Sequence, residues 1–214
     1  MRKLTSVVLV VVAVTVIPCL ASAENFYAAV RGGPGITSDT ENGPASAAVR
    51  DREEYKVGLT GSGAVGYMFP FGLRGEGEFG FIYSPLKREG GVDIDGSVKS
   101  YLLMANAYYD LKLAALGPFK PYVGVGLGGA RVNNDQQTTI SSLGGRKVDV
   151  DTWRTAFAYQ ARVGLGYEVN KLFDVSLGYR YVHIDSGHID NGGRSIFLDE
   201  IRNHAVELGF AIKF

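Results

Sequence analysis

The densest group of residues that could carry out catalysis lies near the C-terminal end of the chain. It comprises His183, Asp185, Ser186, His188 and Asp190. A serine nucleophile with a histidine base would suit a hydrolase, for example one that modifies lipid A at a membrane surface. However, His183 and Ser186 are three positions apart, so on a continuous strand their side chains point to opposite faces. This spacing favours a polar loop over a catalytic pair.

Two other motifs contain the residue types of ligand-binding loops. Asp93-Ile94-Asp95-Gly96 has the beginning of a calcium-loop pattern, but the acidic ligand that should follow it is missing. Gly124-Val125-Gly126-Leu127-Gly128 is rich in glycine, yet no helical pattern follows that could present backbone amides to a phosphate. We therefore expect no catalytic residue, no cofactor and no metal ion.

The first 23 residues have the features of a secretory signal peptide. Two basic residues precede an apolar run from Val7 to Ile17, and Ala21-Ser22-Ala23 is a small-residue cleavage site. This run is too short to cross a bilayer as a helix. We expect residues 1–23 to be removed and residues 24–214 to form the exported domain.

Charge and cysteine content narrow the functions of that domain. The chain has 22 Lys and Arg against 22 Asp and Glu, so no nucleic-acid partner is expected. Its one cysteine, Cys19, lies in the predicted signal peptide. The exported domain must then be held together by backbone hydrogen bonds and buried surface rather than by disulfides.

Strand-like alternation recurs eight times after the signal peptide. In the last segment, the large apolar residues Val206, Leu208, Phe210, Ile212 and Phe214 share one face, and small or charged residues share the other. The predicted strands span 25–32, 55–69, 73–83, 99–111, 120–132, 153–169, 173–183 and 203–214.

The connections between these strands alternate in length. Pro70-Phe71-Gly72, Asn170-Lys171-Leu172 and residues 112–119 form three short links. The long polar segments are 33–54, 84–98, 133–152 and 184–202. Such long loops are unusual in a compact soluble domain and ordinary on the outward end of an outer-membrane barrel. The sequence therefore predicts an all-β fold: an eight-stranded antiparallel up-and-down transmembrane β-barrel with four long outer loops and three short periplasmic turns.

The residue types decide which face of the strands points into the barrel. An eight-stranded barrel has room for little more than its own small side chains, and glycine is rare at water-exposed strand positions. The face with Gly, Ala and charged residues should therefore be internal, where opposite charges can pair. A polar face exposed to water is the alternative. The predicted luminal charges are Arg31, Lys56, Arg74, Arg162, Arg180 and Lys213 against Glu76, Glu78, Asp110, Glu168, Asp174 and Glu207.

Several motifs resemble one known family. The matching stretches are Leu103–Asp110, Pro121–Gly129, Ala158–Gly164, Leu177–Tyr181 and the terminal Phe214. Together they resemble the OmpA-like, opacity-type outer-membrane β-barrels, a group that includes alphaproteobacterial surface antigens and small "porin family" proteins. The resemblance implies no shared catalytic residue. It also implies that the alternating C-terminal strand, ending in Phe214, is an insertion signal for the barrel-assembly machinery.

We accordingly expect a protein of the cell outer membrane, with extracellular loops and periplasmic termini. It should act without enzymatic activity, as a surface antigen, an adhesin or an envelope-stabilising barrel. A narrow porin is the main alternative, and a lipid A-modifying hydrolase is a weaker one. The expected partners are outer-membrane lipid, lipopolysaccharide, the barrel-assembly machinery, and a host or envelope ligand at the loops.

Overall fold

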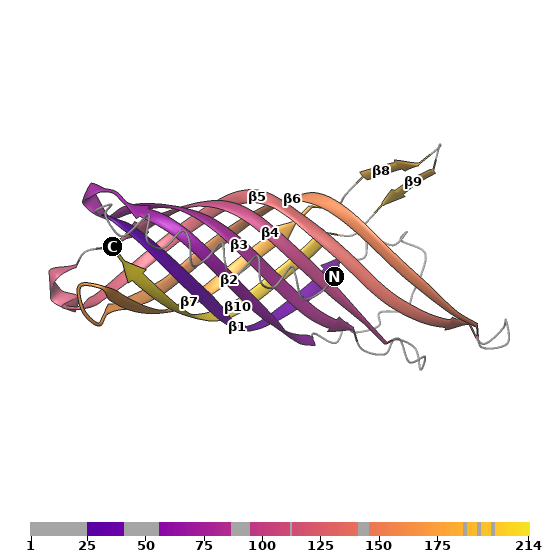
Figure 1. Cartoon of the computed structure of the whole chain (residues 1–214), viewed down its shortest axis with the longest axis horizontal. Coiled ribbons are helices and arrows are strands. Elements are labelled where there is room, and N and C mark those ends of the chain that lie inside the picture. The colour runs from indigo at the N-terminus through magenta and orange to yellow at the C-terminus, as the bar shows by residue number, and fades with distance from the viewer. Residues whose placement is uncertain are drawn as a thin grey trace.

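Eight long strands close into one antiparallel barrel (Figure 1). The computed structural model describes residues 25–40, 56–86, 95–111, 113–140, 146–185, 188–191, 194–197 and 200–214. The barrel strands are β1 Phe26–Thr40, β2 Lys56–Met68, β3 Leu73–Leu86, β4 Asp95–Asp110, β5 Phe119–Ile140, β6 Arg146–Glu168, β7 Phe173–Ile184 and β10 Glu200–Lys213. The predicted eight-stranded up-and-down barrel is confirmed.

The barrel closes where the first strand meets the last. Arg31 of β1 lies opposite Gly209 of β10, and the backbone N–H of Phe214 donates to the carbonyl oxygen of Phe26 (2.9 Å). The other neighbours follow chain order, in the sequence β1-β10-β7-β6-β5-β4-β3-β2. Closure pairs the backbone of both terminal strands and so removes the sheet edges, which is what a strand structure needs in order to exist within lipid.

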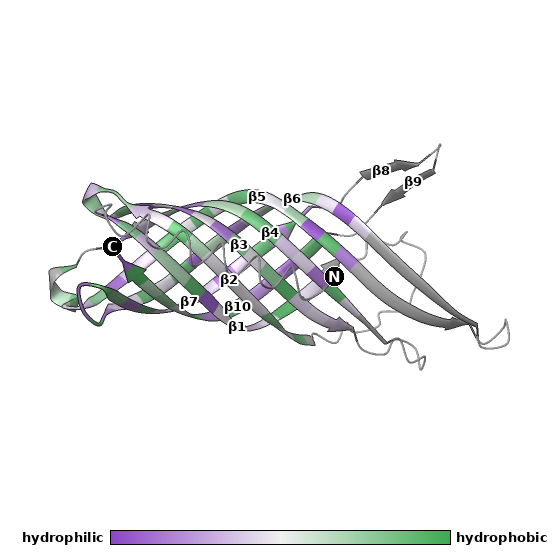
Figure 2. Cartoon of the chain, viewed as in Figure 1, coloured by the Kyte–Doolittle hydropathy of each residue, from purple (hydrophilic) through white to green (hydrophobic). Residues whose placement is uncertain are grey.

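The side chains sort by face as predicted. On β10, Val206 and Phe210 point outward and are 51% and 54% exposed, whereas Ala205 and Glu207 point inward and are 2% and 4% exposed. Apolar and polar segments alternate along the strands of the barrel (Figure 2). An apolar outer surface of this extent is stable in lipid but not in water. The interpretation that the small and charged residues face inward is confirmed.

Three short connections lie at one end of the barrel, which we call the short-turn end. Between β2 and β3 is the 3-10 turn η1 Pro70–Gly72, in which Phe71 has a positive φ of 67°. Between β4 and β5 is η2 Ala114–Leu116. Between β6 and β7, the side-chain oxygen of Asn170 accepts a hydrogen bond from the backbone N–H of Phe173 (2.9 Å). All three predicted turns are confirmed.

Within the described part of the chain, no helix is long and apolar enough to span a membrane.

The opposite end, which we call the long-loop end, differs from the prediction. The predicted loops 33–54, 84–98, 133–152 and 184–202 are too long, because β1 continues to Thr40, β5 to Ile140 and β6 begins at Arg146. In β5 and β6 the ladder continues through polar residues, as where Asp135 pairs with Asp151, so no apolar alternation marks these residues as strand.

β5 and β6 accordingly extend farthest at this end (Figure 1). Part of the predicted loop 184–202 also pairs with itself, as the hairpin β8 His188–Asn191 and β9 Arg194–Phe197. Residues 41–55, 87–94 and 141–145 lie outside the described residues.

Candidate functional site in the barrel lumen

Charged side chains fill the middle of the lumen. They come from inward positions of β1, β3, β6, β7 and β10, which strand alternation points toward the barrel axis. The register places Arg162 of β6 directly beside Arg180 of β7. These two like charges can lie side by side because two carboxylates contact them, one from β3 across the lumen and one from the neighbouring strand β10.

Glu78 and Glu207 supply those carboxylates. Glu78 accepts hydrogen bonds from two nitrogens of Arg162 (2.5 and 3.1 Å) and pairs with Arg180 (3.2 Å). Glu207 pairs with Nε of Arg162 (3.2 Å) and Nη1 of Arg180 (3.3 Å). All four side chains are at most 4% exposed. Each guanidinium therefore bridges two carboxylates, and each carboxylate bridges two guanidiniums.

Glu76 extends this network toward β1. Arg31 donates two hydrogen bonds to Glu76 (2.9 and 2.6 Å), and the Tyr27 hydroxyl donates a third (2.9 Å). Arg31 also lies 3.7 Å from Glu78, which links the two parts. We call the whole cluster the central network. Its charged members are Arg31, Arg162 and Arg180 against Glu76, Glu78 and Glu207, so its formal charge is balanced.

Neutral side chains complete the central network. Asn106 donates to Glu78 (3.1 Å) and accepts from Gln160 (2.6 Å), whose own amide oxygen accepts from Arg180 (2.8 Å). The Tyr108 hydroxyl accepts a hydrogen bond from Arg162 (2.7 Å). These bonds use polar atoms that the ion pairs leave free, which lowers the cost of burying the charges.

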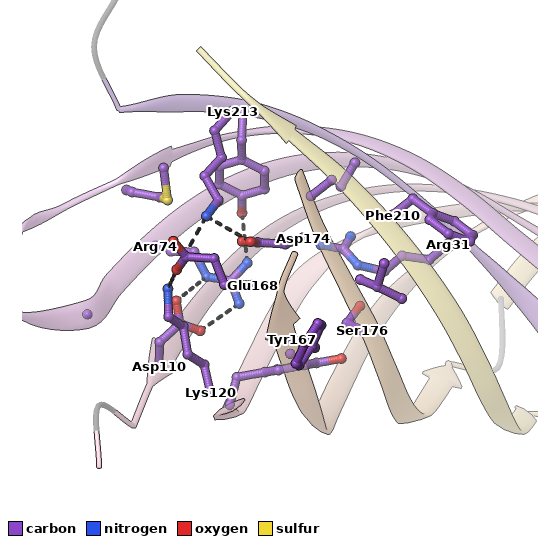
Figure 3. Close-up of a pocket in the computed structure, with 18 of the residues that line it drawn as sticks. Arg31, Arg74, Asp110, Lys120, Tyr167, Glu168, Asp174, Ser176, Phe210 and Lys213 are labelled. Atoms are coloured by element: carbon purple, nitrogen blue, oxygen red, sulfur yellow. Dashed lines mark hydrogen bonds and ion pairs between the residues drawn. The ribbon is translucent and has the colours of Figure 1, made fainter. Parts of the chain in front are cut away.

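A cavity of about 160 Å³ lies between the central network and the short-turn end (Figure 3). Arg74 pairs with Asp110 on its wall (2.8 Å), and Lys213 pairs with Asp174 (2.8 Å) and lies 3.8 Å from Glu168. These ion pairs are partly exposed, so they are worth less than those of the central network.

Two further contacts shape this cavity. Lys120 forms a direct ion pair with Glu168. The guanidinium of Arg74 lies 4.9 Å from the ring centre of Tyr108 and 5.7 Å from that of Tyr122. The aromatic rings and ion pairs enclose this small cavity, which we call the vestibule.

The lumen toward the long-loop end is lined by apolar residues interleaved with buried polar ones. Its buried apolar residues are Ile82, Val98, Leu102, Met104, Ala130, Val132, Ala156, Ala158, Val182, Ile184 and Ile201. We call these apolar residues the apolar layer. Polar side chains are buried at inward positions among them: Thr60, Ser84, Ser100, Arg154 and Asn203. The lumen therefore has three parts in succession: the vestibule, a buried network of balanced charges, and a layer in which apolar residues alternate with polar ones.

The chain matches the model of a known protein family over most of its length. The family model described as "Outer membrane protein beta-barrel domain" matches residues 6–214. The chain belongs to this family. It is a protein of the outer membrane. An outer membrane protein of Gluconacetobacter diazotrophicus is 32% identical over an alignment 203 residues long, which covers 81% of this chain and 52% of that relative's length.

Solved structures agree with this family. Neisserial surface protein A superposes with a TM-score of 0.61 at 22% identity, covering 88% of this chain and 97% of that one. OprG of Pseudomonas aeruginosa gives a TM-score of 0.54 at 15% identity, covering 89% of this chain and 96% of the other. At such identities the likeness concerns the fold.

The structure of this outer-membrane barrel places most of the predicted luminal residues. Arg31, Glu76, Glu78, Arg162, Arg180 and Glu207 meet in the central network. Arg74, Asp110, Glu168, Asp174 and Lys213 form the separate pairs of the vestibule. The side chain of Lys56 lies outside the described residues.

Sequence reasoning missed several luminal residues. Tyr27, Asn106 and Tyr108 fall at inward positions of their strands, and Lys120 lies opposite Gly166 at the end of β5. The alternation of side chains along each strand would have placed them inside the barrel. The same alternation would have shown that Ile82 and Leu102 of the apolar layer lie on the predicted polar face.

The described residues of the histidine cluster at the long-loop end do not form a catalytic pair. The ring of His183 stacks on Tyr159 (4.6 Å between ring centres), and its Nε2 lies 3.1 Å from Asp185 and 3.7 Å from Glu200. Ser186 lies outside the described residues, as do the side chains of His188 and Asp190.

The other predicted motifs fall in two places. Asp93 of the incomplete calcium pattern lies outside the described residues, whereas Gly124–Gly128 is part of strand β5. Among the residues that the structure describes, no group of three His, Cys, Asp or Glu is placed to hold a metal ion. Residues 1–23 lie outside the described residues, and the signal peptide stays a prediction.

Proposed function

We propose that this outer-membrane barrel is a non-enzymatic, non-conducting protein that acts through its long-loop end, as a surface antigen, adhesin or envelope-stabilising anchor. The observation that carries the proposal is the closed lumen. Arg162 and Arg180 bridge Glu78 and Glu207 at 2.5–3.3 Å across the barrel, and the apolar layer lies beyond them. Eight-stranded barrels have an interior just wide enough for their own side chains to fill.

The ends of the barrel support an outward role for the long loops. The short-turn end has compact turns and holds the first residue of β1 beside the last residue of the chain, Phe214. The long-loop end carries β5 and β6 well beyond their neighbours (Figure 1). In outer-membrane barrels short turns face the periplasm and long loops face the exterior. We assign the same orientation here, with the alternating strand Val206–Phe214 presented to the barrel-assembly machinery.

A narrow porin is the alternative, and the vestibule is the observation in its favour. A cavity of about 160 Å³, lined in part by charged side chains such as Arg74 and Glu168, already occupies part of the lumen. Rearrangement of the central network would have to extend it through the apolar layer. Ions would then cross on a continuous water path, which the proposal of a closed barrel excludes.

Single-channel recording in a planar bilayer tests the proposal. The folded wild-type barrel should give no steady conductance. Arg180→Ala is the informative variant, because this arginine is fully buried between two carboxylates, and Glu168→Gln in the vestibule is its matched control. Steady conductance of the wild type would refute the closed barrel and support the porin.

Protease treatment of intact cells tests the orientation separately. Cleavage should occur within residues 41–55 or 141–145 and not at the short turns. Cleavage confined to Pro70–Gly72 or Asn170–Leu172 would show that the barrel has the opposite orientation. A binding screen of the purified barrel on host and envelope surfaces would then identify the ligand of the loops.

A further inference from the structure

The outward face of the barrel carries a group of residues that the lumen does not explain. At the long-loop end of β4, β5 and β6, Lys99, Tyr101, Arg131 and Trp153 lie together; we call them the cationic patch. The register places Tyr101 opposite Arg131, and it places Lys99 and Trp153 on the two sides of Asn133. The patch therefore spans three neighbouring strands.

Aromatic rings hold the arginine of the patch in place. The guanidinium of Arg131 lies 4.7 Å from the ring centre of Trp153. Trp153 in turn stacks on Tyr101, with ring centres 6.2 Å apart and planes inclined by 18°. A cation–π contact orients a guanidinium without neutralising it. The positive charge of Arg131 thus remains available to an anion.

No carboxylate among the described residues compensates the patch. Neither Lys99 nor Arg131 forms an ion pair with a described side chain. Asp135 lies four positions from Arg131 along β5, about 13 Å at the usual rise of a strand, and two positions from Asn133, the residue that pairs with Lys99. The side chains of Asp135 and of Asp151, which pairs with it, lie outside the described residues. Arg202, at the same end of β10, is different, because it forms an ion pair with Glu200. The cationic patch is therefore the better anion site of the two.

The patch lies at the border of the lipid-facing band. Leu103 on β4 and Leu127 on β5 lie next to it on the side of the short-turn end, and they are 70% and 61% exposed on the same face. At the short-turn end, the corresponding outward residues are uncharged: Tyr67, Tyr109, Phe119, Tyr167 and Phe173. The two borders of the band thus differ, since positive charge accompanies the aromatic rings only at the long-loop end of the described strands β4 and β5.

We propose that the cationic patch binds the phosphate of a phosphorylated glycolipid of the lipopolysaccharide class in the outer leaflet. Lys99 and Arg131 supply two positive charges, and a guanidinium can hold two phosphate oxygens at once. Tyr101 and Trp153 are amphipathic rings of the kind that lie at a membrane interface. The inference rests on the proposed function for its orientation, since it assigns the long-loop end to the outer leaflet.

The site provides its own reporter, because Trp153 is the only tryptophan in the chain. The folded barrel in neutral detergent would be titrated with a bis-phosphorylated lipid A while tryptophan emission is recorded. Parallel titrations would use the dephosphorylated lipid and inorganic phosphate. The variants are Lys99→Gln, Arg131→Gln and the double variant, with Lys171→Gln in the short turn at the opposite end as the matched control.

The wild type and Lys171→Gln should show the same saturable change in emission with the phosphorylated lipid. Each substitution in the patch should weaken binding about fivefold, and the double variant about 25-fold, which corresponds to ~1 kcal/mol for each basic residue at an anionic membrane surface. A heat-dependent shift in gel mobility would verify that every variant is folded.

Three results would overturn this inference. They are an equal response to the dephosphorylated lipid, equal binding by the double variant, and an equal response to inorganic phosphate, which would indicate a general anion site. Because the titration is done in detergent, its outcome does not depend on conductance. Failure of lipid binding would refute the lipid site without affecting the proposal of a closed barrel. Measured conductance would refute the closed barrel without affecting the proposal of a lipid site.

Discussion

Replacing Arg162 with methionine tests whether the central network is dry. Methionine keeps most of the length of the side chain and removes the charge, so packing changes little. The substitution removes contacts of 2.5 and 3.1 Å with Glu78, of 3.2 Å with Glu207 and of 2.7 Å with the Tyr108 hydroxyl. The network is then left with one excess negative charge.

The size of the loss follows from the partners that remain. Breaking a buried ion pair by removing one member costs about 3–5 kcal/mol. Glu78 would still have Arg180 at 3.2 Å and Arg31 at 3.7 Å, and Glu207 would still have Arg180 at 3.3 Å. Because these arginines share the excess charge, we expect the lower end of that range, a loss of about 3 kcal/mol in the free energy of unfolding.

Urea unfolding in lipid vesicles, followed by the emission of Trp153, measures this loss. The control is Lys120→Met, because its ion pair with Glu168 is one-third exposed on both sides and should cost at most ~1 kcal/mol. The double variant Arg162→Met/Glu78→Gln restores the charge balance and should lose less than the sum of the single variants. A loss below about 1 kcal/mol for Arg162→Met would show that water reaches the network and would refute the dry lumen.

Three further outcomes are expected. Leu165→Arg should lower the free energy of unfolding in lipid by ~2–4 kcal/mol, because this outward residue faces the bilayer, and a neutral result would contradict the assignment of faces. Gly126→Ala should destabilise the barrel by ~1–3 kcal/mol, because its Cβ would collide with the amide oxygen of Asn106, whereas Gly63→Ala meets open space and should be nearly neutral in the same assay. The unboiled barrel should migrate differently from the boiled chain in detergent gels, because the eight paired strands close into a barrel, and identical mobility would contradict closure.

The sequence by itself determined the strands and their faces. Side chains of a strand alternate in direction, so the spacing of Val206, Glu207 and Leu208 already says which of them share a face. The limited room inside an eight-stranded barrel then assigns the face with glycine and charge to the interior. Turn residues such as Asn170 marked the short-turn end for a similarly local reason, because Asn can satisfy the backbone N–H groups of its own turn.

Only the tertiary structure decided which luminal residues meet. Arg162 and Glu78 lie on strands that are not neighbours in the barrel, so their contact depends on the register and on the tilt that brings β3 and β6 face to face across the lumen. No local pattern contains that information. The same holds for Lys120, which reaches Glu168 because the end of β5 adjoins the end of β6.

The extent of the strands at the long-loop end was also a tertiary property. Between Asp135 and Asp151 the ladder is held by backbone hydrogen bonds, which any residue except proline can form, so a polar sequence there resembles a loop. The cationic patch also depends on the tertiary structure. Lys99, Arg131 and Trp153 are far apart in the chain, and strand pairing alone makes them neighbours on the outward face.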